Sequence, residues 1–181
     1  MTAVIDEIFD LFARFGSGRY GEDLSLAEHM LQAAMLAQAQ GASDALVVAA
    51  LLHDIGYFLH RSDEADEEHD FEHEALGAAW LSRAFGEEVT RPVALHVQAK
   101  RYLCAVDRDY YAQLSDMSRR TLSLQGGVMR EREACRFERD PAFEAALLLR
   151  RCDDRGKDVG ARGPSLEDFR GLIVASIRPS S

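Results

Sequence analysis

Residues 44–59, DALVVAALLHDIGYFL, decide the fold of this chain. Asp44 can begin a helix, and the residues after it are apolar on every side of that helix rather than along one stripe. A helix with no polar face belongs at the centre of a helical bundle. His53 and Asp54 stand inside this segment, where an isolated carboxylate is costly unless a charge or hydrogen bonds compensate it. A divalent cation would supply that charge, although a helix-terminal His-Asp pair also occurs in proteins without a ligand.

The flanking segments also have helical rather than strand spacing. Ser25, with Glu28 three residues later, predicts the start of a helix that Gly41 stops. Pro141 is expected in the first turn of the last long helix. We expect helices over residues 5–12, 25–40, 44–59, 73–86, 87–103, 141–158 and 166–173. Because no segment has a convincing strand pattern, the predicted fold class is all-α, a helical bundle.

Length and composition narrow the class of protein. The 181 residues predict one domain, and a hydrophobic share of 47% is enough for an ordinary core. The 21 Lys and Arg against 31 Asp and Glu give a net charge of −10, which disfavours general binding to the phosphate backbone of nucleic acids. The longest apolar runs are about ten residues or fewer, too short for a membrane span of about 20, and the acidic amphipathic N-terminus is unlike a secretory signal. Neither nucleic acid nor membrane is expected as a partner.

The three cysteines are odd in number and widely spaced, without a CxxC pair. Cys104, Cys135 and Cys152 are therefore interpreted as reduced thiols of a cytoplasmic protein, and not as a disulfide framework or a thiolate zinc site.

Three further polar residues stand among apolar neighbours in separate predicted helices: His29, His96 and Asp153. Each alone is more typical of a core polar group that has its hydrogen bonds. Together with His53 and Asp54 they supply imidazoles and carboxylates from four helices, which is how helical bundles assemble a metal centre.

The order of His29, then His53 and Asp54, then Asp153 resembles the HD-domain superfamily, best known for metal-dependent phosphohydrolases. The resemblance implies a single HD domain over residues 1–181, with a core from about 20 to 158 and a short helix and tail over 160–181.

A closer resemblance rests on HEALGAAWL (73–81), HVQAKRYLCAVDRDYYAQLS (96–115), SLQGGVM (123–129) and LLLRRCDDRGKD (147–158). These segments are most similar to the organophosphonate-cleaving branch of the mixed-valent di-iron HD oxygenases. The resemblance implies two iron ions, as an Fe(II)/Fe(III) pair, with dioxygen as co-substrate. The implied iron ligands are His29, His53, Asp54 and Asp153 for one ion, and His73 and His96 for the other, with Asp54 bridging.

Two histidines compete for one of these positions. His69 and His73 are four residues apart, so both would face the same way on a continuous helix. We choose His73, because it opens a helical pattern whereas His69 lies in an acidic run. His60 is interpreted as a surface residue or a neighbour of the ligands.

Lys100 lies four residues after His96, on the same helix face. It is either an ordinary lysine that reaches solvent or, as the resemblance implies, a contact to an anionic group of the substrate, together with Ser118 and Arg150. Gln125 either orients a loop over the pocket or belongs to the packing of Gly126 and Gly127.

The resemblance also implies that Tyr20 and Glu22 form a lid that meets the substrate amine. The spacing from Tyr20 to His29 is one residue shorter than the family pattern. A second departure is Tyr57, in HDIGY, where this branch often has histidine near the substrate; it bears on which substrate is accepted.

The leading hypothesis is an O₂-dependent di-iron oxygenase that cleaves the C–P bond of a small anionic organophosphonate resembling 1-hydroxy-2-aminoethylphosphonate, giving an amino acid and phosphate. The alternative is a metal-dependent phosphohydrolase of a nucleotide or other phosphoester, which needs only His29, His53, Asp54 and Asp153. A non-catalytic HD module that binds a ligand is the third possibility.

Overall fold

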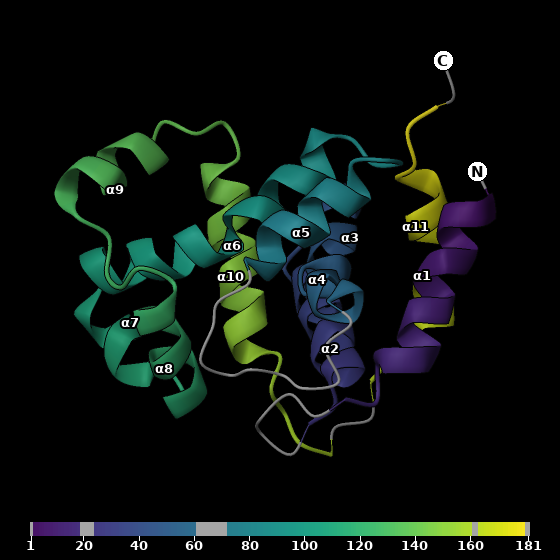
Figure 1. The fold of residues 1–181 in the computed structure, drawn as a ribbon, viewed down its shortest axis with the longest axis horizontal. Coiled ribbons are helices and arrows are strands. Elements are labelled where there is room, and N and C mark those ends of the chain that lie inside the picture. The colour runs from purple at the N-terminus through teal and green to yellow at the C-terminus, as the bar shows by residue number, and fades with distance from the viewer. Residues whose placement is uncertain (1, 19–23, 61–71, 161–162, 180–181) are drawn as a thin grey trace.

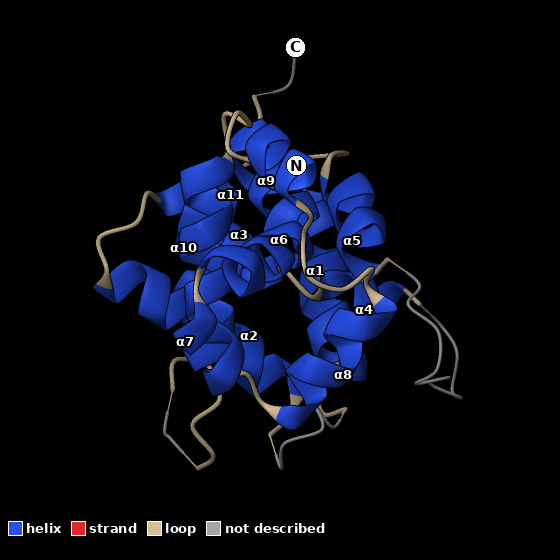
Figure 2. Cartoon of the chain, turned by 90° about the vertical axis from the view of Figure 1, so that its left-hand side faces the viewer, coloured by secondary structure: helices blue, strands red, loops and turns tan. Residues whose placement is uncertain are grey.

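The computed structural model describes residues 2–18, 24–60, 72–160 and 163–179, and within these ranges every regular element is a helix (Figure 2). The helices are α1 (Thr2–Phe15), α2 (Leu26–Ala39), α3 (Asp44–Leu52), α4 (Ile55–Leu59), α5 (His73–Leu81), α6 (Glu87–Val106), α7 (Arg108–Gln113), α8 (Asp116–Leu124), α9 (Glu131–Phe137), α10 (Phe143–Arg155), the 3-10 helix η1 (Leu166–Phe169) and α11 (Arg170–Ala175). The all-α expectation is confirmed. No described helix is long and apolar enough to cross a membrane.

Helix α3 forms the centre of the bundle, as its sequence predicts. Every residue from Leu46 to Leu52 is buried, with at most 7% of its surface exposed. Helices α2, α6 and α10 pack around it, and α1 and α11 cover the side opposite α7, α8 and α9 (Figure 1). The Ser25 hydroxyl accepts from the Glu28 backbone N–H and the Glu28 carboxylate accepts from the Ser25 N–H, so the predicted capping box begins α2.

The expectation of one continuous helix over residues 44–59 is wrong. Helix α3 ends at Leu52, α4 begins at Ile55, and His53 and Asp54 form the turn between them. The turn arises at Asp54, whose φ of −101° and ψ of 12° lie outside helical values. On a continuous helix adjacent side chains point about 100° apart. The break therefore allows the imidazole and the carboxylate to face the same interior space.

Other helix bounds also differ from expectation: α6 continues to Val106, and α10 ends at Arg155 rather than near residue 158. Helix α5 ends at Leu81 rather than near residue 86, and Gly86 is the N-cap of α6. Helix α10 begins at Phe143, and Pro141 lies before it in a turn that the Asp140 carboxylate closes by accepting from the Ala142 N–H at 3.0 Å. Helix α9 was not predicted.

Helices α7 and α8 are joined to the bundle largely by polar contacts. None of the residues of α7 is buried, and in α8 only Ser118 and Leu122 are. Beyond them a small apolar cluster, which includes Met129, Phe137 and Ala146, seats α9 against α6 and α10. The segment from α7 to α8 therefore brings polar side chains next to the centre of the bundle.

Candidate metal centre

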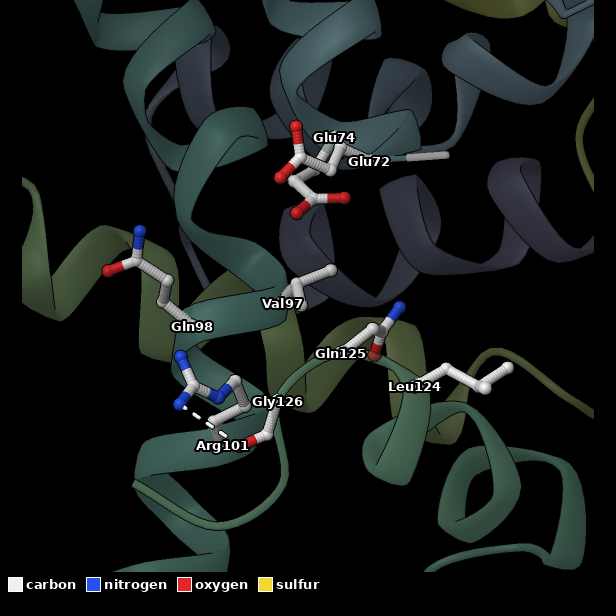
Figure 3. A pocket seen from close by; sticks show the side chains of 8 residues that line it. All are labelled: Glu72, Glu74, Val97, Gln98, Arg101, Leu124, Gln125 and Gly126. Atoms are coloured by element: carbon white, nitrogen blue, oxygen red, sulfur yellow. Dashed lines mark hydrogen bonds between the residues drawn. The ribbon is translucent and has the colours of Figure 1, made fainter. Parts of the chain in front are cut away.

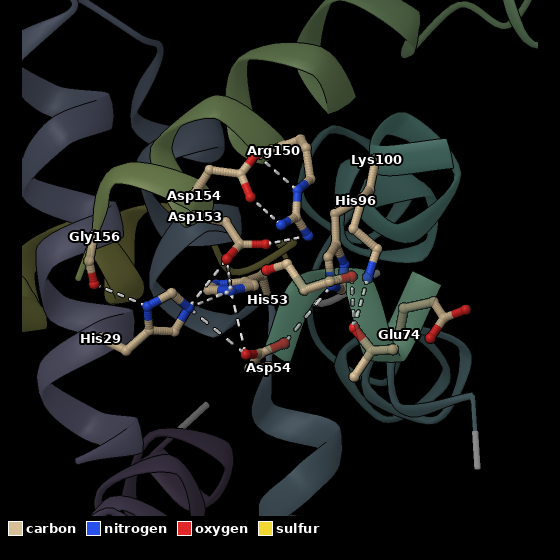
Figure 4. A network of polar contacts seen from close by, with 12 residues as sticks. His29, His53, Asp54, Glu74, His96, Lys100, Arg150, Asp153, Asp154 and Gly156 are labelled. Atoms are coloured by element: carbon tan, nitrogen blue, oxygen red, sulfur yellow. Dashed lines mark hydrogen bonds and ion pairs between the residues drawn. The ribbon is translucent and has the colours of Figure 1, made fainter. Parts of the chain in front are cut away.

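The structure brings the six predicted metal ligands together in one buried space. Figure 4 labels His29, His53, Asp54, His96 and Asp153. The six residues come from α2, the turn before α4, the first residue of α5, the middle of α6 and the end of α10, and none is more than 4% exposed. They form two groups. The first cluster is His29, His53 and Asp153, and the second cluster is Asp54, His73 and His96.

In the first cluster, three ligand atoms surround a common point. The Nε2 atoms of His29 and His53 are 3.2 Å apart. Asp153 Oδ1 lies 3.2 Å from Nε2 of His29 and 3.9 Å from Nε2 of His53.

The second cluster has the same form. The Nε2 atoms of His73 and His96 are 3.2 Å apart, and Asp54 Oδ1 lies 3.2 Å and 3.6 Å from them, respectively. The other oxygen, Oδ2, faces the first cluster at 3.4 Å from Nε2 of His53 and 3.7 Å from Nε2 of His29. One carboxylate therefore presents one oxygen to each cluster, as a bridging ligand does.

Backbone carbonyls set the orientation of three imidazoles. Nδ1 of His29 lies 2.9 Å from Gly156 O, Nδ1 of His53 2.8 Å from Ala50 O, and Nδ1 of His96 2.8 Å from Val93 O. A carbonyl can only accept, so each Nδ1 carries a proton and Nε2 is directed inward as a potential ligand. Nδ1 of the fourth, His73, instead lies 3.5 Å from a carboxylate oxygen of Glu74.

The site contains two buried carboxylates, Asp54 and Asp153, whose negative charge requires compensation. Asp153 Oδ1 is buried and accepts no hydrogen bond from the described residues. Burial alone would raise the pKa values of Asp54 and Asp153, but His53 holds the first well below its usual range and Arg150 the second. Burial lowers the pKa of His53, yet the two carboxylates outweigh it and raise that pKa to about 9. Without a metal, His53 therefore carries the compensating proton.

Burial, with the neighbouring imidazoles of His73 and His53, lowers the pKa of His96 to about 3 and keeps it neutral. Four imidazoles and two ionised carboxylates suit divalent first-row metals such as iron, manganese or zinc. The residues present therefore fit a pair of metal ions, and a metal at the first cluster would displace the proton of His53.

Gly56 allows the second cluster to form. A Cβ atom at this position would lie 2.8 Å from the carbonyl carbon and 3.0 Å from Cα of His73. The absence of a side chain lets α4 approach the first turn of α5 closely enough for His73 to reach Asp54.

Basic and hydroxyl side chains line the wall between α6, α8 and α10. Lys100 is only 3% exposed and donates from Nζ to Thr121 Oγ1 at 3.0 Å. Burial, followed by the charge of Arg150, lowers the pKa of Lys100 to about 8. Ser118 is also buried, and Lys157 Nζ donates to its hydroxyl at 3.3 Å. Lys100 is therefore not the solvent-reaching lysine of the alternative interpretation.

Sequence reasoning missed Thr121 and Lys157. For Thr121 the available signal was its spacing, because it follows Ser118 by one turn of α8. Lys157 lies beyond the end of α10, where helical spacing gives no signal.

Tyr57 lies beside the second cluster. Its ring stacks on the His73 imidazole, with centroids 4.4 Å apart and planes inclined by 23°, and 37% of the residue remains exposed. His60 is exposed and belongs to neither cluster. Tyr20, Glu22 and the rival His69 lie outside the described residues.

A pocket of about 590 Å³ lies between the start of α5, the middle of α6 and the loop after α8 (Figure 3). Its lining includes Glu72, Glu74, Val97 and Gln125. Arg101, in the AKRYL motif, donates from Nε to Gly127 O at 2.9 Å and thereby holds the LQGG loop. Gly126 and Gly127 have φ values of 89° and 70° that favour glycine, and Gln125 lines the pocket. An orienting role of Gln125 stays a prediction.

Comparison with known proteins agrees with this geometry. The HD domain family matches residues 26–122. A hydroxymethylphosphonate dioxygenase of Gimesia maris is 44% identical over 97% of this chain and 89% of its own length. The chain belongs to the HD-domain family.

Two further relatives extend the comparison. A [1-hydroxy-2-(trimethylamino)ethyl]phosphonate dioxygenase (glycine-betaine-forming) of Leisingera caerulea is 37% identical over 94% of this chain and 88% of its own. An uncharacterised protein of Acanthamoeba polyphaga mimivirus is 32% identical over 98% of this chain and 83% of its own. The predicted likeness to the phosphonate-cleaving oxygenase branch is confirmed.

Proposed function

We propose that this protein is a di-iron oxygenase that uses dioxygen to cleave the C–P bond of a 1-hydroxyphosphonate, with a 1-hydroxy-2-aminoethylphosphonate-like compound as substrate. The overall reaction consumes one dioxygen per substrate and releases a carboxylic acid, here an amino acid, and inorganic phosphate. Its proposed metal ligands are the residues of the two clusters: His29, His53, Asp54, His73, His96 and Asp153.

The bridging carboxylate is the observation that carries this proposal. Asp54 turns one oxygen toward each cluster, and the second cluster has its own pair of imidazoles at 3.2 Å. A hydrolase that binds one metal would need only the first cluster and Asp54. The second cluster is costly to bury, since it places two imidazoles against a carboxylate in the protein interior, and binding of a second metal explains why the chain keeps it.

The names of the relatives support the class of substrate. Both functionally named relatives are dioxygenases of phosphonates that carry a hydroxyl on the carbon next to phosphorus. The two phosphonates differ in the other group on that carbon, so the names support a 1-hydroxyphosphonate as the substrate class. The amino group of the substrate is a separate and more specific proposal.

The chain's own residues provide a place for the phosphonate. Lys100, Ser118 and Arg150 lie buried on one wall, and a phosphonate there would meet cationic and hydroxyl donors in a region of low dielectric, where charge-assisted hydrogen bonds are strong. In this proposal Tyr57, which is stacked on His73 and partly exposed, would contact the group that the substrate carries beyond its hydroxyl. Bound iron would supply the one-electron chemistry that dioxygen activation requires and that side chains lack.

The test is metal content followed by turnover. Protein loaded with Fe(II) without oxygen should hold two irons per chain. Exposed to air, it should consume dioxygen and release phosphate from one of three compounds: hydroxymethylphosphonate, 1-hydroxy-2-aminoethylphosphonate or its trimethylamino analogue. We expect the amino compound to react with the highest kcat/KM.

His96→Ala should leave one metal and abolish the reaction, while His60→Ala, which changes an exposed histidine outside both clusters, should change neither. Phosphate release from a phosphoester without oxygen, retained in His96→Ala, would refute the oxygenase assignment. Preference for another of the three phosphonates would refute only the proposed substrate.

A further inference from the structure

The Arg150 guanidinium contacts two carboxylates. It is buried, and Nη1 forms an ion pair with Asp153 Oδ2 at 2.6 Å. Its other edge is occupied by Asp154, with Nε donating to Oδ2 at 3.1 Å and Nη2 donating to Oδ1. Tyr110 completes the arrangement: its hydroxyl donates to Asp154 Oδ2 at 2.5 Å and accepts from Arg150 Nε at 3.2 Å.

Asp154 is a second carboxylate at a largely buried position beside Arg150. Together with Asp153 it balances the charges of two buried cations, Arg150 and the nearby Lys100. Asp154 also has a geometric effect: a guanidinium binds a carboxylate best through two parallel N–H groups, and Asp154 occupies the Nε and Nη2 edge of Arg150.

The two oxygens of Asp153 are consequently different. Oδ2 is bound to Nη1, whereas Oδ1 accepts no hydrogen bond from the described residues and faces His29 and His53. If the Nε and Nη2 edge were vacant, Arg150 could turn and take both oxygens of Asp153, removing that carboxylate from the first cluster.

We infer that Asp154 and Tyr110 are positioning residues of the first cluster. They hold Arg150 in the orientation in which it takes one oxygen of Asp153 and leaves Oδ1 for the metal. This inference rests on the metal centre of the proposed function, and not on its substrate. Removing Asp154 should therefore weaken metal binding at the first cluster selectively.

The chain offers a matched control pair. The Tyr102 hydroxyl donates to Glu138 Oε1 at 2.9 Å, which is also a tyrosine–carboxylate hydrogen bond. It lies in the aromatic cluster with Phe137 and Phe143, and neither residue contributes to the two groups of potential ligands. Tyr102→Phe and Glu138→Gln thus remove the same chemical groups without touching the clusters.

The experiment measures binding of Mn(II), counted by the EPR signal of the free ion, to the full-length chain stripped of metal with a chelator. Variants are made in the His96→Ala background, in which only the first cluster retains its ligands. Asp154→Asn should lower the affinity for Mn(II) about tenfold to a hundredfold, the usual range for a partner of a metal ligand. Tyr110→Phe should act in the same direction with a smaller effect, and the control pair should leave the affinity unchanged.

In the chain with His96 intact, Asp154→Asn should lower the affinity for one of the two Mn(II) ions and leave the affinity for the other unchanged. A general loss of stability would not produce this pattern. Unchanged affinity in both Asp154→Asn and Tyr110→Phe would overturn the inference, and so would an equal loss in the control pair. Because wild-type binding of two ions is measured alongside, a failed inference is distinguishable from the absence of a two-metal site, which would refute the proposed function.

Discussion

Replacing Gly56 by alanine should remove one metal ion and leave the other. A Cβ at this position would lie 2.8 Å from the carbonyl carbon and 3.0 Å from Cα of His73, and closer still to the carbonyl oxygen. Carbon atoms in contact prefer a separation of about 3.5 Å or more. The obstacle is backbone and cannot rotate away, so the start of α5 must move by roughly 0.7 Å or more relative to α4.

That displacement is large for a metal site and moderate for the fold. Metal–ligand distances tolerate only about 0.2 Å. Asp54 and His73 stand on opposite sides of the disturbed contact, at 3.2 Å between Oδ1 and Nε2, so the second cluster loses its geometry. The first cluster is built on α2, the turn after α3, and α10, away from that contact. Overpacking of this kind typically costs about 1–3 kcal/mol, which leaves most of the fold intact.

The assay is metal content per chain after reconstitution with Fe(II), read together with the helical circular dichroism signal. Gly56→Ala should bind one iron where the wild type binds two. Gly77→Ala, whose Cβ would meet Gly56 N at 3.2 Å, should show a weaker version of the same loss. A Cβ at Gly171 would meet no atom within 4 Å, so the control variant Gly171→Ala should bind two irons. A folded Gly56→Ala protein that binds two irons with wild-type affinity would refute the reasoning.

Three further predictions concern charge and stability. In the metal-free protein the pKa of His53 is raised from 6.5 to about 9, so its stabilising contribution is complete below pH 6.5 and is lost as pH rises through 9. Urea titrations of protein stripped of metal should therefore show a free energy of unfolding that falls between these two pH values. A free energy that does not change over this range would contradict the assignment of the proton to His53. Lys100→Gln should raise KM for the phosphonate about tenfold or more at unchanged iron content, since a charge-assisted hydrogen bond is lost; steady-state kinetics with an unaltered KM would remove Lys100 from the substrate site. Ser25→Ala should lower the free energy of unfolding by about 1 kcal/mol through loss of the cap that holds Glu28, without changing metal content, and a loss of iron would show that the start of α2 is coupled to His29.

Sequence patterns over a few neighbouring residues predicted most of the fold and most of the candidate ligands. The run of apolar residues after Asp44 predicted the central helix, and the Ser25 and Glu28 pair predicted where α2 begins, because both signals act between residues a few positions apart. Five candidate ligands were found because histidine and aspartate are rare among apolar neighbours, whereas His73, which stands between two glutamates, came from the family resemblance. Their meeting in one space rests on the tertiary structure, and their role as ligands stays a prediction.

The positions of the helix breaks were not predictable in the same way. The turn at His53 and Asp54 interrupts an apolar run that favours one continuous helix, and it becomes understandable only when α5 is seen against Gly56. Helix α9 was missed because its short, charged sequence has little periodicity, and it is seated by residues such as Phe137 that pack against distant helices.

Residue type and spacing along the chain thus determine which side chains are helical, which are buried and which can bind a metal, since these preferences arise from each residue and its near neighbours. Only the folded structure decides that Asp54 faces both clusters, that Lys157 reaches Ser118, and that Asp154 occupies the free edge of Arg150. These relations depend on distances of a few ångströms between helices that are far apart in sequence, and such distances are set by how the helices pack against one another.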